Sequence, residues 1–251
     1  MVTRPPSPSS EPAPTAGPVL HRGADATEQA REVAALVADQ LQQALAQRPR
    51  ATLVVSGGRT PVVMWQALRE APLDWRRVDI TLADERWVPP DHPASNEGLL
   101  QQHLLQGPAA QVHWWPLFNG AATPAEGLGL LEASLAQGPS WPADVVVLGM
   151  GSDGHTASWF PHQALPDGAQ RCMAVAAPPP PNVVEPRVSL TPAALLSARC
   201  LLVHLQGRDK ESTLLQALLP PGFDEAQQAL ALPIRRALWA PRQACQVFYT
   251  P

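Results

Sequence analysis

Short apolar runs alternate with helix-like segments along nearly the whole chain, and this alternation constrains the fold more than any other feature. The clearest runs cover residues 51–55, 78–82, 144–148 and 200–205, and each is rich in Val, Leu or Ile. Short runs that are mostly apolar are typical of strands buried on both faces of a parallel sheet, and residues 144–148 are the most apolar of the four. The sequence therefore predicts an α/β fold with a Rossmann-like, mostly parallel sheet and helices on both faces.

Helix-start signals occur between these runs. Asp25 with Glu28 forms a capping-box pattern ahead of an apolar stripe that ends before Pro49, and Thr60 is expected to cap a helix that begins at Pro61. Further helices are expected over residues 96–106 with Ser95 as cap, after Thr191 with Pro192 as first residue, and over 211–218. Two more strands are expected, over 187–190 and, at the edge of the sheet, over 246–249.

Composition limits the cellular setting and the class of partner. The 251 residues carry a formal net charge of −4, which argues against a surface dedicated to nucleic acid or anionic membrane. No apolar run approaches the roughly 20 residues that a membrane span needs. The three cysteines are scattered, as is usual in a reducing compartment such as the cytoplasm. Residues 1–18 are rich in Pro and Ser and are expected to be a disordered tail, which leaves 19–251 as a single α/β domain.

Polar clusters follow directly on the ends of several predicted strands. Ser56-Gly57-Gly58-Arg59 follows residues 51–55, Asp84-Glu85-Arg86 follows 78–82, and Gly149–His155 follows 144–148. In open parallel sheets ligands bind outside the carboxyl ends of the strands. The clusters are therefore expected to meet at one rim of the sheet.

The Ser56-Gly57-Gly58 segment lies between a strand and a helix start. Glycines allow close approach of the backbone to an anion, and amides at a helix start point toward it. The alternative is a tight turn with no ligand. The spacing matches neither the P-loop nor the dinucleotide-binding pattern, so a nucleotide is not the expected ligand.

The segment Gly149–His155 places an imidazole and a carboxylate after two glycines at a strand end. Histidine can accept a proton from water near neutral pH, and a neighbouring carboxylate such as Asp153 can fix its tautomer. The alternative is that His155 caps a helix over 156–160 while Asp153 only supports the turn. The glycine setting favours a catalytic base.

Three cations are candidates for binding an anionic group. Arg86 could form a bidentate fork with phosphate or carbonyl oxygen, or it could belong to an exposed charged turn. Lys210 follows the 200–205 strand, whereas Arg187 begins its strand, which favours the opposite rim. His92 and His162 lie beside prolines and are expected to be turn residues. Pro178–Pro181 is expected to form a stiff loop over the site.

Five motifs in this order resemble 6-phosphogluconolactonases. They are SGGRTP (56–61), ADERWVPPDHPASN (83–96), GMGSDGHTASWFP (149–161), PRVSLT (186–191) and GRDK (207–210), and the resemblance spans about residues 20–250. The second and third motifs are long and specific. The resemblance implies a fold like that of glucosamine-6-phosphate deaminases and hydrolysis of the lactone of 6-phosphogluconate in the oxidative pentose phosphate pathway. It also implies no metal or organic cofactor, and a monomer or homodimer whose partner is the small sugar-phosphate lactone.

The resemblance also implies roles for individual residues. His155 is the expected general base on water, oriented by Asp153, with Arg86 as the third catalytic residue. The expected substrate- and phosphate-binding residues are Ser56, Gly57, Gly58, Arg59, Thr60, Asp84, Gly151, Arg187 and Lys210. Trp159 stands where leucine is usual, and Glu211 follows Lys210 where alanine is common; neither departure touches the expected chemistry.

Two other functions are compatible with parts of the pattern. A deaminase-like isomerase is disfavoured because such enzymes carry Asp-Glu-Tyr where this chain has Asp84-Glu85-Arg86, and Phe-Asn-Glu after the histidine. A sugar-phosphate sensor without catalysis is disfavoured by the intact Asp153-Gly154-His155 and by an N-terminal tail too short to form a DNA-binding domain.

Overall fold

The computed structural model describes residues 17–176, 185–240, 242 and 244–251. The expected Pro178–Pro181 loop and nearly all of the expected tail, residues 1–16, lie outside the described residues. Within the described part of the chain, no helix is both long and apolar enough to cross a membrane.

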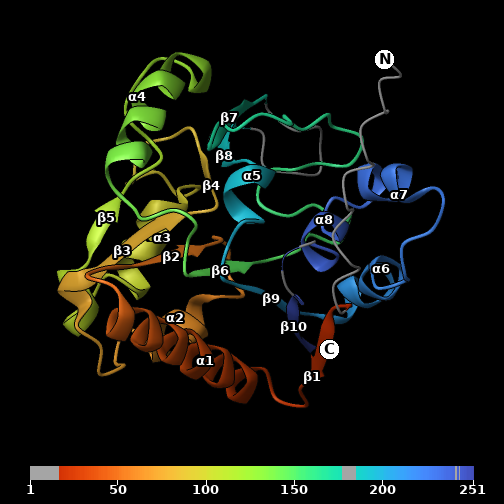
Figure 1. Cartoon of the computed structure of the whole chain (residues 1–251), viewed down its shortest axis with the longest axis horizontal. Coiled ribbons are helices and arrows are strands. Elements are labelled where there is room, and N and C mark those ends of the chain that lie inside the picture. Colours follow the sequence, from red (N-terminus) through yellow and green to blue (C-terminus); the bar gives the residue numbers. More distant parts are fainter. Residues whose placement is uncertain (1–16, 177–184, 241, 243) are drawn as a thin grey trace, which may run out of the picture.

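A seven-stranded parallel sheet runs through the middle of the molecule (Figure 1). From one edge to the other its strands are β1 (Val19–Arg22), β10 (Gln246–Thr250), β9 (Cys200–Gln206), β6 (Val145–Leu148), β2 (Ala51–Val55), β3 (Val78–Leu82) and β5 (His113–Trp115). The predicted α/β class with a mostly parallel sheet is confirmed. All residues of β2, β3 and β6 are buried, including Asp79 and Thr81, the two polar residues of β3. Burial on both faces is typical of the inner strands of a parallel sheet.

The prediction that residues 246–249 form an edge strand is wrong. β10 is an inner strand, because β1 pairs with its outer side in parallel register, with Leu20 opposite Val247. β1 has only four residues and follows the Pro/Ser-rich segment directly, so the sequence carried no apolar run to indicate it. His21 in β1 packs on Phe248, with 4.5 Å between the ring centroids.

A second, three-stranded antiparallel sheet lies beside the first and was not predicted. Its order is β4 (Asp84–Arg86), β8 (Arg187–Leu190) and β7 (Cys172–Val175). Ala83 joins the two sheets: its amide donates to the carbonyl of Val55, and its carbonyl accepts from the amide of Leu190. Residues 187–190 therefore form a strand as predicted, but in the antiparallel sheet.

Helices cover both faces of the parallel sheet, with α1 and α2 below it and α5 and α8 above it in Figure 1. The helices are α1 (Ala26–Gln47), α2 (Val62–Leu68), α3 (Asn96–His103), α4 (Pro124–Gln137), α5 (Pro192–Leu195), α6 (Glu211–Ala217), α7 (Glu225–Ala231) and α8 (Arg235–Leu238). Three short 3₁₀ helices are η1 (Trp75–Arg77), η2 (Gly107–Gln111) and η3 (Arg208–Lys210).

The predicted caps are partly confirmed. Asp25, Ser95 and Thr191 each accept a backbone N–H with the side chain at the start of α1, α3 and α5. Thr60 does not cap α2: the helix begins at Val62, and Pro61 before it already has helical φ and ψ. α3 ends at His103 and not at 106, because the chain turns there toward Gly107, whose φ is +55°.

Candidate active site

The order of the strands places a crevice between β2 and β6. From β2 the chain proceeds outward through β3 and β5 on one side, whereas β6, β9 and β10 lie on the other. Loops that leave β2 and β6 therefore diverge at a topological switch point, where open α/β sheets bind ligands. These two loops are the predicted segments 56–60 and 149–155.

A cavity of about 280 Å³ occupies this position. Eleven of the twelve residues expected in the site line it: Ser56, Gly57, Gly58, Arg59, Thr60, Asp84, Arg86, Gly151, His155, Arg187 and Lys210. The twelfth, Asp153, does not line the cavity but contacts His155. Residues far apart in sequence are thus brought together at the carboxyl end of the sheet, as the positions of the polar clusters predicted.

His155 and Asp153 form a direct pair. Nδ1 of His155 lies 2.6 Å from Oδ1 of Asp153, and the same oxygen accepts the backbone N–H of His155 at 3.1 Å. Partial burial alone would raise the pKa of the Asp153 carboxyl, but its hydrogen bond with His155 and the attraction between the two groups outweigh burial and lower that pKa. The carboxylate therefore stays ionised and fixes the imidazole with Nε2 directed away from it.

Gly151 makes room for the imidazole. A Cβ atom at this position would lie 2.2 Å from Cε1 and 2.3 Å from Nδ1 of His155, far inside van der Waals contact. The amide of Gly151 also donates to the carbonyl of His155 at 2.9 Å, which closes the loop on itself. A glycine is needed here for close approach of the ring to the backbone.

No helix follows His155, so the alternative in which His155 caps a helix over 156–160 is wrong. Ala157 adopts a left-handed φ of 47°, which interrupts any helix. Ser158 and Trp159 are bound to β8 instead: the amide of Ser158 donates to Oγ of Ser189 at 3.3 Å, and Nε1 of Trp159 donates to the carbonyl of Leu190 at 2.9 Å. These contacts hold the segment in a tight turn.

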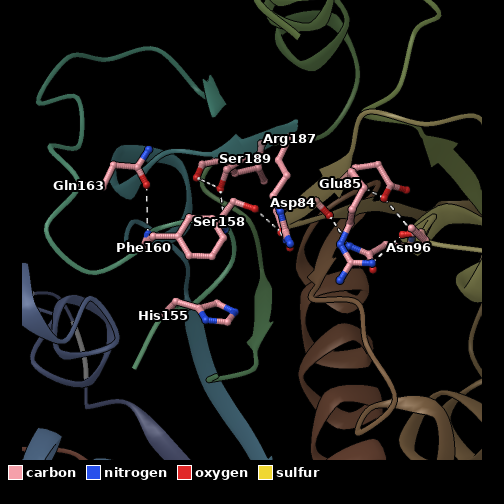
Figure 2. Close-up of polar contacts among 12 residues, drawn as sticks. Asp84, Glu85, Asn96, His155, Ser158, Phe160, Gln163, Arg187 and Ser189 are labelled. Atoms are coloured by element: carbon pink, nitrogen blue, oxygen red, sulfur yellow. Dashed lines mark hydrogen bonds and ion pairs between the residues drawn. The ribbon is translucent and has the colours of Figure 1, made fainter. Parts of the chain in front are cut away.

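Arg86 lines the cavity from β4. The neighbouring Glu85 holds this strand in position through hydrogen bonds to the start of α3. The Glu85 carboxylate accepts the amides of Arg86, Asn96 and Glu97 at 2.6–2.8 Å (Figure 2). Complete burial raises the pKa of Glu85 to about 7, although these hydrogen bonds oppose the shift. Nη1 of Arg86 donates to the carbonyl of Ala94 at 2.6 Å, while Nε is buried with no hydrogen-bond partner among the described residues.

Arg187 also reaches the cavity, contrary to the expectation that it lies on the opposite rim. It pairs with Arg86 across β8 and β4, and these strands are antiparallel, so the start of one lies beside the end of the other. Its Nη1 is 3.6 Å from Oδ2 of Asp84, which also accepts Oγ–H of Ser158 at 2.5 Å (Figure 2). Its guanidinium lies 5.3 Å from the ring centroid of Phe160, which is 5.1 Å from that of His155.

Lys210, the last residue of η3, also lines the cavity. Burial lowers the pKa of its ammonium group, and Asp209 partly offsets this effect. The adjacent Glu211 pairs with Arg22 of β1, so the edge strand helps to hold this segment.

Three polar residues that sequence analysis did not assign to the site, Asn96, Thr156 and His204, also line the cavity. Nδ2 of Asn96 donates to the carbonyl of Asp84 at 3.0 Å, and its amide group packs so closely on Gly57 that a Cβ there would lie 2.0 Å from Oδ1. Asn96 stood directly after a predicted cap and ended the motif over 83–96, but neither position assigned it to the site. His204 is the one histidine in the apolar run over 200–205, but the run was interpreted only as a buried strand, so the residue was not considered for the site.

The histidines considered as turn residues do not line the cavity. Nδ1 of His92 accepts the amide of Ala94 at 3.1 Å, and His162 has a left-handed φ of 63° in a turn. Among the residues that the structure describes, no group of three or more His, Cys, Asp and Glu side chains is arranged to hold a metal ion.

Known proteins resemble this chain in sequence and in fold. The family model described as glucosamine-6-phosphate isomerases/6-phosphogluconolactonase matches residues 24–245. A 6-phosphogluconolactonase of Pseudomonas aeruginosa is 44% identical over 232 residues, which are 90% of this chain and 93% of that protein. The chain belongs to the 6-phosphogluconolactonase family.

Solved structures agree with this assignment. A 6-phosphogluconolactonase from Shewanella baltica OS155 matches with a TM-score of 0.85 and 38% identity, covering 93% of this chain and 98% of that one. A monomeric glucosamine-6-phosphate deaminase matches with a TM-score of 0.69 and 18% identity, covering 92% and 97% of the two chains, which shows a shared fold alone. This enzyme of the 6-phosphogluconolactonase family thus has the predicted deaminase-like fold.

Proposed function

We propose that the enzyme hydrolyses 6-phosphoglucono-δ-lactone to 6-phosphogluconate, as the names of its relatives suggest, in the oxidative pentose phosphate pathway. The observation that carries the proposal is the His155–Asp153 pair at a cavity lined by Arg86, Arg187 and Lys210. A base beside several cations suits an anionic substrate that is attacked by water.

His155 is the proposed general base. Because Nδ1 is bound to Asp153, its N–H points to the carboxylate and Nε2 carries the free lone pair. Nε2 takes a proton from a water molecule, whose oxygen forms a bond to the lactone carbonyl carbon. The bond from that carbon to the ring oxygen then breaks, and the ring oxygen takes the proton back from Nε2, which restores the base.

The positive lining of the cavity supports the same step. Negative charge develops on the carbonyl oxygen as water attacks, and fixed cations in a partly buried site stabilise such charge strongly. Arg187 is held in place by its contact to Asp84, so little reorganisation is needed when charge develops. Asp84 contributes by keeping Arg187 in position.

The phosphate of the substrate is proposed to lie on residues 56–60, with Arg86 on one side and Lys210 on the other. Gly57 and Gly58 offer backbone amides, whereas the amide of Ser56 already donates to the carbonyl of Val147. Ser56, Arg59 and Thr60 complete the loop at the cavity wall. Asn96 supports this loop from below through its contact with Gly57. The enzyme needs no resident cofactor for these steps.

The proposal is tested by titrating acid release from 6-phosphoglucono-δ-lactone at constant pH, against the spontaneous rate without enzyme. An enzyme-dependent rate that saturates with substrate is expected. Glucosamine 6-phosphate is the matched control, because a deaminase-like isomerase would release ammonia from it. Ammonia release without lactone hydrolysis would overturn the proposal.

A further inference from the structure

His204 lines the cavity from β9, whose other residues are apolar except for the terminal Gln206. Val203 of β9 pairs with Leu148 of β6, so the next position places His204 beside Gly149, the first residue of the loop that carries His155. The residue is only 5% exposed, and it lines the cavity together with Gly149 and Lys210.

One ring nitrogen of His204 has no hydrogen bond to any of the described residues. Its Nδ1 is buried and has no hydrogen-bond partner among the residues that the structure describes. Buried polar nitrogens nearly always have a partner, and each exception calls for an explanation. His21 provides the contrast: Phe248 separates it from His204 in the same row of the sheet, and its Nε2 lies 2.7 Å from Oε1 of Gln246.

The imidazole of His204 is neutral near pH 7. Burial lowers its pKa to about 4, and the nearby charge of Lys210 acts in the same direction. A neutral imidazole carries one N–H. No described residue accepts a hydrogen bond from Nδ1, so a proton on Nδ1 would be a buried N–H without a partner. The tautomer with the proton on Nε2 avoids this cost and makes Nε2 a hydrogen-bond donor.

We propose that His204 is a substrate-binding residue whose Nε2–H donates a hydrogen bond to a phosphate oxygen of the ligand, beside Lys210. This inference rests on the proposed function, which places a phosphate in the cavity. The cavity already contains the cations Arg86, Arg187 and Lys210. A neutral donor adds a further bond to phosphate without adding another desolvated charge next to Lys210.

The test uses two variants of His204 and one matched control. His204→Leu removes the donor and keeps an apolar volume, whereas His204→Gln retains an N–H donor. His21→Leu removes a histidine from the same row of the sheet outside the cavity. Binding of inorganic phosphate and of 6-phosphogluconate is measured by calorimetry, steady-state KM and kcat are measured with the lactone, and thermal unfolding is followed for all variants.

For His204→Leu we expect about a tenfold weaker Kd for phosphate and a similar rise in KM, with kcat within about threefold of the unmodified enzyme. His204→Gln should recover most of the affinity, and His21→Leu should bind as the unmodified enzyme does. A raised KM with nearly unchanged kcat in His204→Leu, together with recovered affinity in His204→Gln, is not expected of a residue that only packs in the core.

Three outcomes would overturn the inference. The first is unchanged phosphate affinity in His204→Leu, even with a raised KM, since the contact would then be to the sugar or absent. The second is an equal loss in His204→Leu and His204→Gln, and the third is an equal loss in His21→Leu. Phosphate calorimetry does not depend on catalysis, so it decides the role of His204 even if the lactone is not hydrolysed.

Discussion

Nδ1 of His155 lies 2.6 Å from Oδ1 of Asp153, and that same carboxylate oxygen accepts the backbone N–H of His155. Two bonds from one residue to one oxygen fix both the direction of the imidazole and its tautomer. Asp153 and His155 are separated by a single residue, so a loop of very few residues builds the pair without help from a distant element. A short loop after a strand is therefore enough to hold both the imidazole and the carboxylate that orients it.

Replacing His155 by Ala is expected to lower kcat by about a hundred- to ten-thousand-fold, which is the usual contribution of one positioned base. The fold should remain, because the His155 side chain contacts the cavity and is 24% exposed. Steady-state kinetics corrected for spontaneous hydrolysis, together with thermal unfolding, provide the measurement. Turnover close to that of the unmodified enzyme would rule out His155 as the base.

Gly151→Ala tests the same geometry through the backbone. The new Cβ would overlap Cε1 and Nδ1 of His155, so the ring must move away from Asp153. We expect kcat to fall at least tenfold in a folded protein. Gly129→Ala in α4 is the matched control, because nothing lies within 4 Å of a Cβ there and alanine is favoured in a helix by about 0.5–1 kcal/mol. Equal kinetics for the two variants would contradict the assignment.

Most of the candidate site could be located from the sequence, because its residues directly follow the ends of predicted strands. A buried strand reveals itself by its apolar run, and the polar residues that follow must lie at the carboxyl edge of the sheet. The pair Asp153 and His155, and the loop from Ser56, could therefore be placed without knowing the complete topology. Asp84 was assigned to the site from the resemblance, and its contact with Arg187 shows how it reaches there.

What the sequence did not reveal depends on pairings between distant segments. Only Ala83 separates β3 from β4, so nothing local signals that the chain passes into a second sheet. The partner strand β8 lies about a hundred residues further along, and its antiparallel direction is what brings Arg187 to the cavity. His204 was missed for a related reason, since only the register between β9 and β6 shows that it lies beside the loop that carries His155.

Arg86→Ala is expected to weaken substrate binding more than turnover. Loss of a charge-assisted contact to phosphate corresponds to about a ten- to hundredfold rise in KM. Inorganic phosphate should compete with the lactone in the unmodified enzyme and compete less well in the variant. Arg69→Ala is the control, because Arg69 pairs with the exposed Glu70 outside the cavity. Equal hydrolysis of unphosphorylated gluconolactone and the phosphorylated lactone would contradict a phosphate site.

Glu85 should make the free energy of unfolding depend on pH. Its pKa is raised to about 7 in the folded protein by burial, against 4.5 for an unperturbed carboxyl. Between these values the folded state holds a proton that the unfolded state has lost, so stability falls as pH rises through this window. The expected loss is on the order of 3 kcal/mol. Denaturant titrations from pH 5 to pH 7.5 measure it, and the same titrations on Glu85→Gln should lack most of the slope. A slope of equal size in that variant would assign the effect to other groups.

The last prediction separates water activation by histidine from water activation by zinc. A catalytic zinc usually has three protein ligands, and His92 and His162 are the histidines that lie beside the two longest motifs in the sequence. Among the described residues, no three His, Cys, Asp or Glu side chains, His204 included, are arranged to hold a metal ion. Nδ1 of His92 is occupied by the amide of Ala94, and neither histidine lines the cavity. Prolonged treatment with a chelator is therefore expected to leave the rate unchanged. Activity that disappears in the chelator and returns on addition of zinc would reverse the assignment and make His92 or His162 a ligand.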